Sequence, residues 1–478
     1  MWPMFMPVTL AEIIAGTATA ITLGWVADDA LVAWSLVVLF VGLKLTETDD
    51  NLFVLPAAFS FHWMQTSLGV LYKGLFAREV ATVYSSNYRP MVWIGLGCCL
   101  ALAVGLRLGL MFVKGANPHE ERPTFAFSLQ LLATVYIITV FFEGSLLLVS
   151  GQYPSLRQII VTADTARLGV LYLILRRLLI PEPRWSMFAA VLIVECVLGV
   201  TGFFAGFREP VVLAGLALYE IFDRRITRHW LALATGAVLA TVLAVLWMGI
   251  RTQYRREYTE VDAFATSRSA RLREVSALSS AFFGTDMETV LASTDKLVDR
   301  LWAVYYPSLA IERVPSMLPH TNGSFITGAM LHAVTPRVLF PGKAALQSDS
   351  EKVRKYSGIN VAGADQNTSI AFGYAAESYI DFGYPFMFVP IFAFGLALGG
   401  AYRLFGRLIW HHELFVAFAT ITFWLSIYLF ERSWATMLGA TVGMMVYLGL
   451  PVILLDRTLL VRFERQQRDA QGLLYDAH

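Results

Sequence analysis

The chain has 478 residues, of which 56% are hydrophobic and only 15% are charged, and its formal net charge is +1. A soluble globular protein carries roughly 25% charged residues, so the composition excludes that class. The near-zero net charge gives no sign of a nucleic-acid partner.

The apolar residues fall in blocks of about 20, the length that crosses a bilayer as a helix. They predict an all-α polytopic membrane protein with about 12 transmembrane helices. Residues 1–250 would form a bundle of about nine helices, residues 382–455 would hold the last three, and residues 456–478 would be a tail. The expected spans lie near 5–27, 31–47, 52–73, 90–113, 125–149, 156–179, 185–206, 209–223, 229–250, 382–405, 413–430 and 434–455.

Basic residues in short loops set the orientation of such a bundle, because cytoplasmic loops are enriched in Lys and Arg. Loops such as "DRRITRH" and "RLFGRLIWHH" are basic, whereas alternate loops such as "VADDA" and "ERSW" carry at most one basic residue. Both termini are therefore expected in the cytoplasm of a bacterial inner-membrane protein. Residues 251–381 would form one large periplasmic loop with short surface helices. The stretch 74–89, with Arg78 and Arg89, is the exception to the charge asymmetry.

Basic side chains at the outer ends of the spans are the first candidates for a site. Arginine is always charged, and its planar fork binds phosphate oxygens with two hydrogen bonds. A lipid diphosphate at headgroup depth would need such groups, although arginines at helix ends also serve simply as anchors. The expected set is Arg208, Arg251, Arg255, Arg256, Arg337, Lys343 and Arg432.

Acidic and imidazole side chains supply candidate bases. Glu377 lies close to the point where the chain re-enters the membrane, and a carboxylate partly removed from water can act as a general base. A capping or salt-bridging role is the alternative. His320 and His332 are the other candidates in the long loop, unless they are surface residues. Asp164 and Arg167 lie three apart in the sixth span, and predict either a buried pair or a proton path.

Several catalytic signatures are absent from the sequence. There is no G-x-x-x-x-G-K-[ST] phosphate loop, no dinucleotide fingerprint and no H-E-x-x-H motif. These absences give no support to an ATP-driven pump, a nicotinamide enzyme or a zinc protease. We expect no cofactor and no bound metal.

Two stretches carry a family resemblance. "TPRVLFPGKAAL", followed by "TSIAFGYAAESYIDFGYPFMFVPIFAFGLALG", resembles the late region of Wzy-type polysaccharide polymerases, a membrane family related to the O-antigen ligases. The turn "GFREP" is similar to the G-x-R element of that family. The many spans and the single late loop agree with its architecture.

The resemblance implies a GT-C-like glycosyltransferase that needs no nucleotide sugar. Its substrate would be an oligosaccharide repeat unit on undecaprenyl diphosphate, polymerised into O-antigen, capsule or exopolysaccharide at the periplasmic face. Arg337 and Arg208 would act on the diphosphate together with the other basic residues, Glu377 would be the base, and Tyr379 and His320 would contact substrate. A chain-length regulator and a flippase would be partners in the same membrane.

Three other interpretations remain open. A metal-dependent GT-C transferase would use acidic residues in its first external loop, where Asp28 and Asp29 lie. An O-antigen ligase would depend on a periplasmic histidine, His320 or His332. A transporter of polysaccharide precursors would use the pair Asp164 and Arg167.

Overall fold

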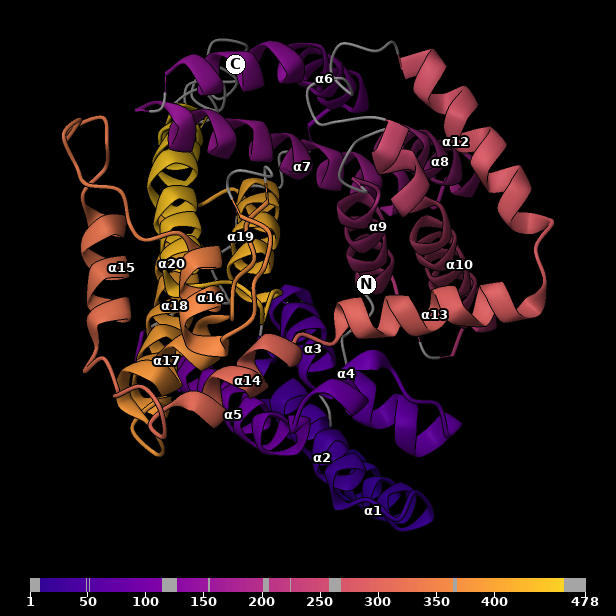
Figure 1. The fold of residues 1–478 in the computed structure, drawn as a ribbon. Helices are drawn as coiled ribbons and strands as arrows, with labels where there is room; N and C mark the ends of the chain where they lie inside the picture. The colour runs from indigo at the N-terminus through magenta and orange to yellow at the C-terminus, as the bar shows by residue number, and fades with distance from the viewer. Residues whose placement is uncertain are drawn as a thin grey trace, which may run out of the picture.

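The computed structural model describes residues 9–48, 50, 52–113, 127–153, 155–200, 206–223, 225–257, 268–363 and 368–459. Within these ranges the fold is all-helical and contains no strand. Every one of the twelve expected spans coincides with a helix (Figure 1). These helices are α1 (Leu10–Val26), α2 (Ala30–Thr46), α3 (Val54–Phe76), α5 (Tyr88–Phe112), α6 (Leu129–Gln152), α7 (Arg157–Leu179), α8 (Trp185–Val200), α9 (Arg208–Glu220), α10 (Thr227–Glu257), α18 (Phe388–Leu408), α19 (His412–Ile427) and α20 (Trp434–Gly443), which continues through the π-helical turn η2 (Met444–Leu448).

Five helices in the described part of the chain are long and apolar enough to cross a membrane by length and composition. They cover Tyr88–Phe112, Arg157–Leu179, Thr227–Tyr254, Phe388–Leu408 and Trp434–Leu459. Other expected spans are shorter apolar helices, among them α1, α2, α8 and α19. The expected eighth span is the shortest of the set, because α9 has only 13 residues. The structure is that of a helical membrane protein.

The long segment between α10 and α18 is itself largely helical. Figure 1 shows α12 and α13 wrapped around α10, while α15 stands along the opposite flank beside α20. Between them, α14, α16 and α17 pack together. The bounds are α12 (Arg268–Phe283), α13 (Met287–Leu301), α14 (Tyr305–Arg313), α15 (Ser324–Val334), α16 (Asp349–Ser357) and α17 (Tyr374–Phe382), and a short α4 (Ala81–Ser85) precedes α5.

Helices α5 and α18 pack backbone to backbone. Gly105 and Gly109 on α5 face Gly395 and Gly399 on α18. A Cβ atom on Gly109 would lie 2.2 Å from the carbonyl oxygen of Leu396, so no larger residue fits this contact. Small residues four apart on both helices are the usual means by which membrane helices approach so closely.

Polar contacts join the connections at one end of the bundle. Asp29 accepts two hydrogen bonds of 2.9 Å from Arg89, and Asp295 on α13 accepts bonds of 3.0 and 2.6 Å from Arg78. Arg300, also on α13, pairs with Glu431 in the turn between α19 and α20. We call this set of contacts the Tyr428 layer, after the tyrosine that ends α19 three residues before Glu431. These contacts also explain the two basic residues of the 74–89 stretch, since each has an acidic partner in this layer.

A second polar layer lies at the opposite ends of the same helices. Tyr402 donates to Asp50 at 2.6 Å, and Arg176 donates to Glu220 at 2.7 Å. Asp456 accepts from the backbone of His411 at 2.8 Å, and we call this set the Asp456 layer. Helices α2, α3, α5, α9, α19 and α20 connect the two layers. The apolar core lies between them.

Candidate functional site

Tyr428 lies between two arginines from distant parts of the chain. The guanidinium carbons of Arg208 and Arg432 are each 5.1 Å from the centroid of its ring. Arg208, at the start of α9, also donates a 2.9 Å hydrogen bond from Nη2 to the phenolic oxygen. Arg432 donates to the carbonyl of Leu425, which directs its side chain back along α19. The tyrosine therefore positions both cations.

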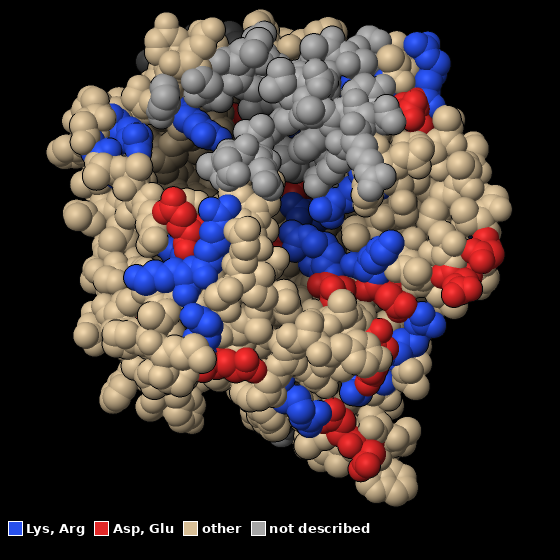
Figure 2. Space-filling model, viewed as in Figure 1, with Lys and Arg blue, Asp and Glu red and all other residues tan. Residues whose placement is uncertain are grey.

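Two further arginines complete an arginine cluster, which we define as Arg208, Arg251, Arg300 and Arg432. Arg300 is close enough to Arg208 and Arg251 for the like charges to repel one another. It remains 52% exposed although it donates bonds of 2.7 and 3.0 Å to Glu431. Figure 2 shows Lys and Arg side chains gathered near the middle of this face, between α9 and α19, with acidic side chains beside them.

The charge balance of the cluster leaves it cationic. Arg208 pairs with its neighbour Glu209, and Arg300 pairs with Glu431. Among the described side chains, four guanidinium groups thus face two carboxylates, which leaves an excess of two positive charges. Arg208 remains 43% exposed, so a ligand can reach it. Exposed forked donors with excess positive charge suit an anion that carries several phosphate oxygens.

The turn that carries Tyr428 and Arg432 is held rigidly. The backbone N–H of Phe430 donates to Gln65 Oε1 on α3 at 2.6 Å. Its carbonyl oxygen would lie 2.5 Å from a Cβ atom at residue 373, where the chain has a φ of +93°. Only glycine accepts both this positive φ and the close approach of the carbonyl oxygen without strain, and residue 373 is a glycine. The turn is thus clamped between α3 and the start of α17.

Glu377 lies in a buried network directly behind this turn. Its Oε1 accepts a 2.7 Å bond from Lys352 on α16, and its Oε2 accepts a 2.7 Å bond from the backbone N–H of Trp434. Lys352 also contacts Asp349, which in turn accepts a 2.9 Å bond from Ser433. Glu377 is 1% exposed. The carboxylate therefore fixes the first residue of α20, two positions after Arg432.

Burial and charge act in opposite directions on this pair. Burial raises the pKa of Glu377, and the lowering effect of Lys352 and the Trp434 amide does not fully cancel it. Burial lowers the pKa of Lys352, but the negative charges of Glu377 and Asp349 outweigh burial. The pKa of Lys352 is therefore also raised. The pKa of Glu377 is thus raised mainly by its burial, whereas the pKa of Lys352 is raised by the two carboxylates that share it.

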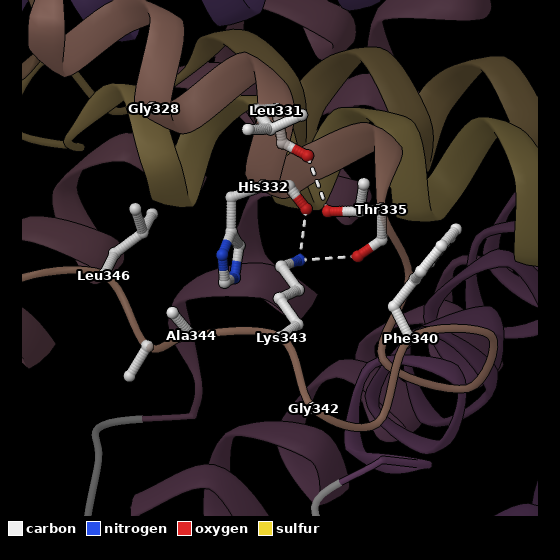
Figure 3. Close-up of a pocket in the computed structure, with 10 residues that line it drawn as sticks. Gly328, Leu331, His332, Thr335, Phe340, Gly342, Lys343, Ala344 and Leu346 are labelled. Carbon is white, nitrogen blue, oxygen red and sulfur yellow. Dashed lines mark hydrogen bonds between the residues drawn. The ribbon is translucent and has the colours of Figure 1, made fainter.

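The other expected basic residues lie elsewhere. Lys343 donates to the carbonyl oxygens of His332 and Thr335, the latter at 2.7 Å, and so caps the C-terminal end of α15 (Figure 3). Arg337 is half-buried in the same loop, within electrostatic reach of Lys343 and His332. Among the described residues, the contacts of this loop are with α15 and not with the arginine cluster. Arg255 and Arg256 lie in α10, but their side chains fall outside the described residues.

His320 and Tyr379 form a separate aromatic pair. Their ring centroids are 5.9 Å apart in an edge-on arrangement, and His320 Nδ1 lies 3.2 Å from the carbonyl oxygen of Ile380. His332 instead lines an open groove of about 520 Å³ with Thr335 and Lys343, between α15 and the chain that follows it. Within the described part of the chain, the contacts of His320 are to α17 and those of His332 to α15 and the loop that follows it, not to the arginine cluster.

The structure also shows the positions of the residues that a metal-dependent transferase or a transporter would use. Asp29 caps α2 through a 2.9 Å bond from Leu31 and pairs with Arg89, while Asp28 has a φ of +49° in the same turn. Among the described residues no group of three or more His, Cys, Asp or Glu side chains is arranged to hold a metal ion. Asp164 and Arg167 are both half-buried on α7.

A family model covers most of the elements that build this site. The model described as a domain of unknown function (DUF8712) matches residues 97–414, more than half of the chain. The chain belongs to this family. The DUF8712 match includes Arg208, Arg251 and Arg300 but ends before Tyr428 and Arg432. No curated protein and no solved structure matches the chain.

Some residues of the site were not singled out by the sequence. Tyr428 lies inside an apolar run and Lys352 in a charged helix, and each has one partner that is more than twenty residues away, Arg208 and Glu377 respectively. Arg300 was not among the basic residues expected in the site. The sequence signal was the adjacent pair Glu431 and Arg432 in "FERSW". It shows that a carboxylate lies beside the cluster, and in the structure this carboxylate pairs with Arg300.

Proposed function

We propose that this protein is a membrane glycosyltransferase that polymerises oligosaccharide repeat units carried on undecaprenyl diphosphate. The observation that carries the proposal is the arginine cluster around Tyr428. It offers cationic, partly exposed forks at one end of a helical membrane bundle. A lipid diphosphate presents its phosphates at the membrane surface, so a cationic site at a helix end is well placed to meet it.

The reaction requires a nucleophile, a leaving group and a base. A sugar hydroxyl of the acceptor attacks the anomeric carbon of the donor glycan, and the bond from that carbon to the diphosphate oxygen breaks. The electron pair leaves with the lipid diphosphate, and the hydroxyl proton passes to a base. The arginine cluster would stabilise the negative charge that grows on the diphosphate as the bond breaks. Electrostatic stabilisation by arginine side chains does not itself require a bound metal or cofactor.

The contacts of Glu377 support a positioning role in this reaction. Both of its oxygens are engaged, one by Lys352 and one by Trp434, and it holds the turn that presents Arg432. Its role as the base remains a prediction from the sequence. Glu431 and Glu209 are the carboxylates that lie within the cluster itself.

We also propose a topology of twelve spans with a GT-C-like arrangement. The two polar layers support it, because helices that connect them alternate in direction along the chain from α2 to α5 and from α19 to α20. The Tyr428 layer would face the periplasm of a bacterial inner membrane, and both termini would be cytoplasmic. This orientation rests on the basic loops next to the Asp456 layer.

A reconstituted reaction tests the proposal. The purified full chain in nanodiscs would be incubated with undecaprenyl-diphosphate-linked repeat units and no nucleotide sugar, and the products would be separated by length. We expect a ladder of longer lipid-linked glycans. We also expect the ladder to be lost in the variant R208A/R432A and kept in Lys355→Ala, which removes an exposed cation on α16 outside the cluster.

Two outcomes would overturn the proposal. One is a folded wild-type protein that extends no lipid-linked glycan, and the other is an undiminished ladder in R208A/R432A. Transfer of glycan only to a lipid A core acceptor would establish the ligase instead, and His320→Ala and His332→Ala would then identify its histidine. Movement of the lipid-linked unit across a vesicle membrane without growth would establish a transporter.

A further inference from the structure

Residues 324–348 begin and end beside the same point of the bundle. The first turn of α15 is held by Asp381 on α17, whose oxygens accept from the backbone N–H of Phe325 at 3.1 Å and of Ile326 at 2.9 Å. The segment ends at Asp349, which accepts from Ser433, the residue that caps α20. The chain therefore leaves the Tyr428 layer and returns to it.

Between these ends α15 runs alongside α20 in the same direction. Both helices start from α17, since Asp381 holds the N-terminus of α15 and Glu377 holds that of α20. The two helices pack against each other. The 11 residues of α15 extend about 17 Å at 1.5 Å each, which is roughly half of a ~30 Å hydrocarbon core.

α15 covers the part of α20 that would otherwise face outward. The strongly exposed apolar side chains of α20 and its continuation begin only at Val446 (40% exposed) and recur at Leu450 and Leu454. On α15 the exposed apolar residues are Met330, Leu331 and Val334, at 54%, 66% and 66%. The exposed polar residues Ser324 and Thr327 lie nearer its N-terminal end. The apolar exterior of α20 is thus continued by α15. If lipid surrounds α20, it must also surround the outer face of α15.

The polar groups of the segment are arranged for such an environment. A helix that ends in hydrocarbon leaves carbonyl oxygens without partners, which costs several kcal/mol for each group. Lys343 satisfies two of these oxygens, those of His332 and Thr335, and its charge also suits the negative end of the helix dipole. Figure 3 shows His332 and Lys343 facing the groove between α15 and the returning chain. Polar groups at membrane depth are tolerated where they line such a cavity.

We infer that residues 324–348 form a re-entrant hairpin, in which α15 enters the bilayer beside α20 and the following loop returns to the same side. The hydrocarbon of the outer leaflet surrounds the outer face of this hairpin and contacts Met330, Leu331, Val334 and the exposed tip residue Leu339. The groove side remains polar. This inference takes its leaflet from the proposed orientation of the bundle but does not depend on the proposed reaction.

Spin labels measure the depth of such a segment directly. Cys98 and Cys99 are fully buried and can stay, whereas Cys196 is replaced by alanine. Single cysteines at Leu331 and Leu339 are then spin-labelled in vesicles of phosphatidylethanolamine and phosphatidylglycerol. Leu454 on the continuation of α20 is the lipid control, and exposed Glu351 on α16 is the water control.

We expect labels at Leu331 and Leu339 to collide with oxygen more than with a water-soluble nickel chelate, as the label at Leu454 does. The reverse preference, as at Glu351, would overturn the inference. Labels at Leu331 and Leu454 that both prefer the nickel chelate would overturn it too, because α20 would then not lie in lipid. Val334→Cys replaces either variant that fails to fold.

Sidedness separates a hairpin from a span. Cysteines at Met317, before the segment, and at Glu351, after it, are tested in sealed vesicles of uniform orientation with a membrane-impermeant maleimide. A hairpin gives the same result at both positions. Reaction at one and protection at the other would show that the segment crosses the membrane, and the inference would be wrong.

Discussion

Glu377 accepts a 2.7 Å hydrogen bond from the backbone N–H of Trp434, and so fastens α17 to the first residue of α20. The same carboxylate pairs with Lys352 on α16 at 2.7 Å. Three helices that are separate in the sequence therefore meet at one buried ion pair. Directly above it, the turn from Tyr428 to Arg432 presents Arg432 of the arginine cluster and the ring that Arg208 also contacts. The buried pair supports the exposed site.

Removal of one partner of this pair should destabilise the protein strongly. Glu377→Gln leaves the ammonium of Lys352, which is 7% exposed, without a full counter-charge. Breaking a buried ion pair from one side typically costs about 3–5 kcal/mol. We expect a clear fall in the Tm of the detergent-solubilised protein. The double variant E377Q/K352M should recover part of the loss, and a double variant less stable than E377Q would contradict this account.

The same pair predicts a pH dependence. Because the pKa of Glu377 is raised above its ordinary 4.5, the stability it contributes is complete below that value and is lost as the pH rises through the raised pKa. The Tm advantage of the wild type over E377Q/K352M should therefore shrink as the pH increases from 4.5. An advantage that grows over this range would show that the pKa of Glu377 is lowered.

The sequence predicted the positions of the helices better than the contacts between their side chains. Apolar blocks located the helices within a few residues, because the bilayer imposes both length and composition on a helix. Five helices in the described part of the chain are long and apolar enough to cross a membrane, and the twelve-span topology stays a prediction. The partners of Arg208 and Glu377 could not be read in the same way, since Tyr428 and Lys352 lie far away along the chain. Arg337 and Lys343 looked like members of one cationic site. Only the fold shows that Lys343 instead caps α15.

Tyr428 should contribute to diphosphate binding through its two arginines. Tyr428→Phe removes the 2.9 Å bond from Arg208 but keeps the ring, while Tyr428→Leu also removes the cation–π contacts. A hydrogen bond of about 0.5–1.5 kcal/mol predicts a roughly two- to tenfold weaker Kd for Tyr428→Phe. Calorimetry with farnesyl diphosphate, a short-chain lipid diphosphate, would measure this. Equal affinity in wild type and Tyr428→Leu would exclude the role.

Close packing between α5 and α18 should make their glycines intolerant of even a methyl group. In Gly399→Ala the new Cβ atom would lie 2.2 Å from the carbonyl oxygen of Leu106, so the helices must separate. Overpacking of this kind typically costs about 1–3 kcal/mol. Gly236→Ala on α10 is the matched control, because nothing lies within 4 Å of its added atom. We expect a lower Tm for the first variant only, and equal Tm values would refute the close approach.

Finally, the geometry of the arginine cluster predicts that charge alone will not sustain activity. Arg432→Lys keeps the positive charge but loses the planar fork, so a phosphate can no longer be held by two parallel bonds. The loss of one charge-assisted bond, worth about 1.5–3 kcal/mol, corresponds to a roughly ten- to hundredfold slower extension of lipid-linked glycans. Arg89→Lys, at an exposed pair with Asp29 in the same layer, should leave the rate unchanged. If both lysine variants extended glycans at the wild-type rate, the cluster would act only as a general field of positive charge. Bidentate binding by Arg432 would then be wrong.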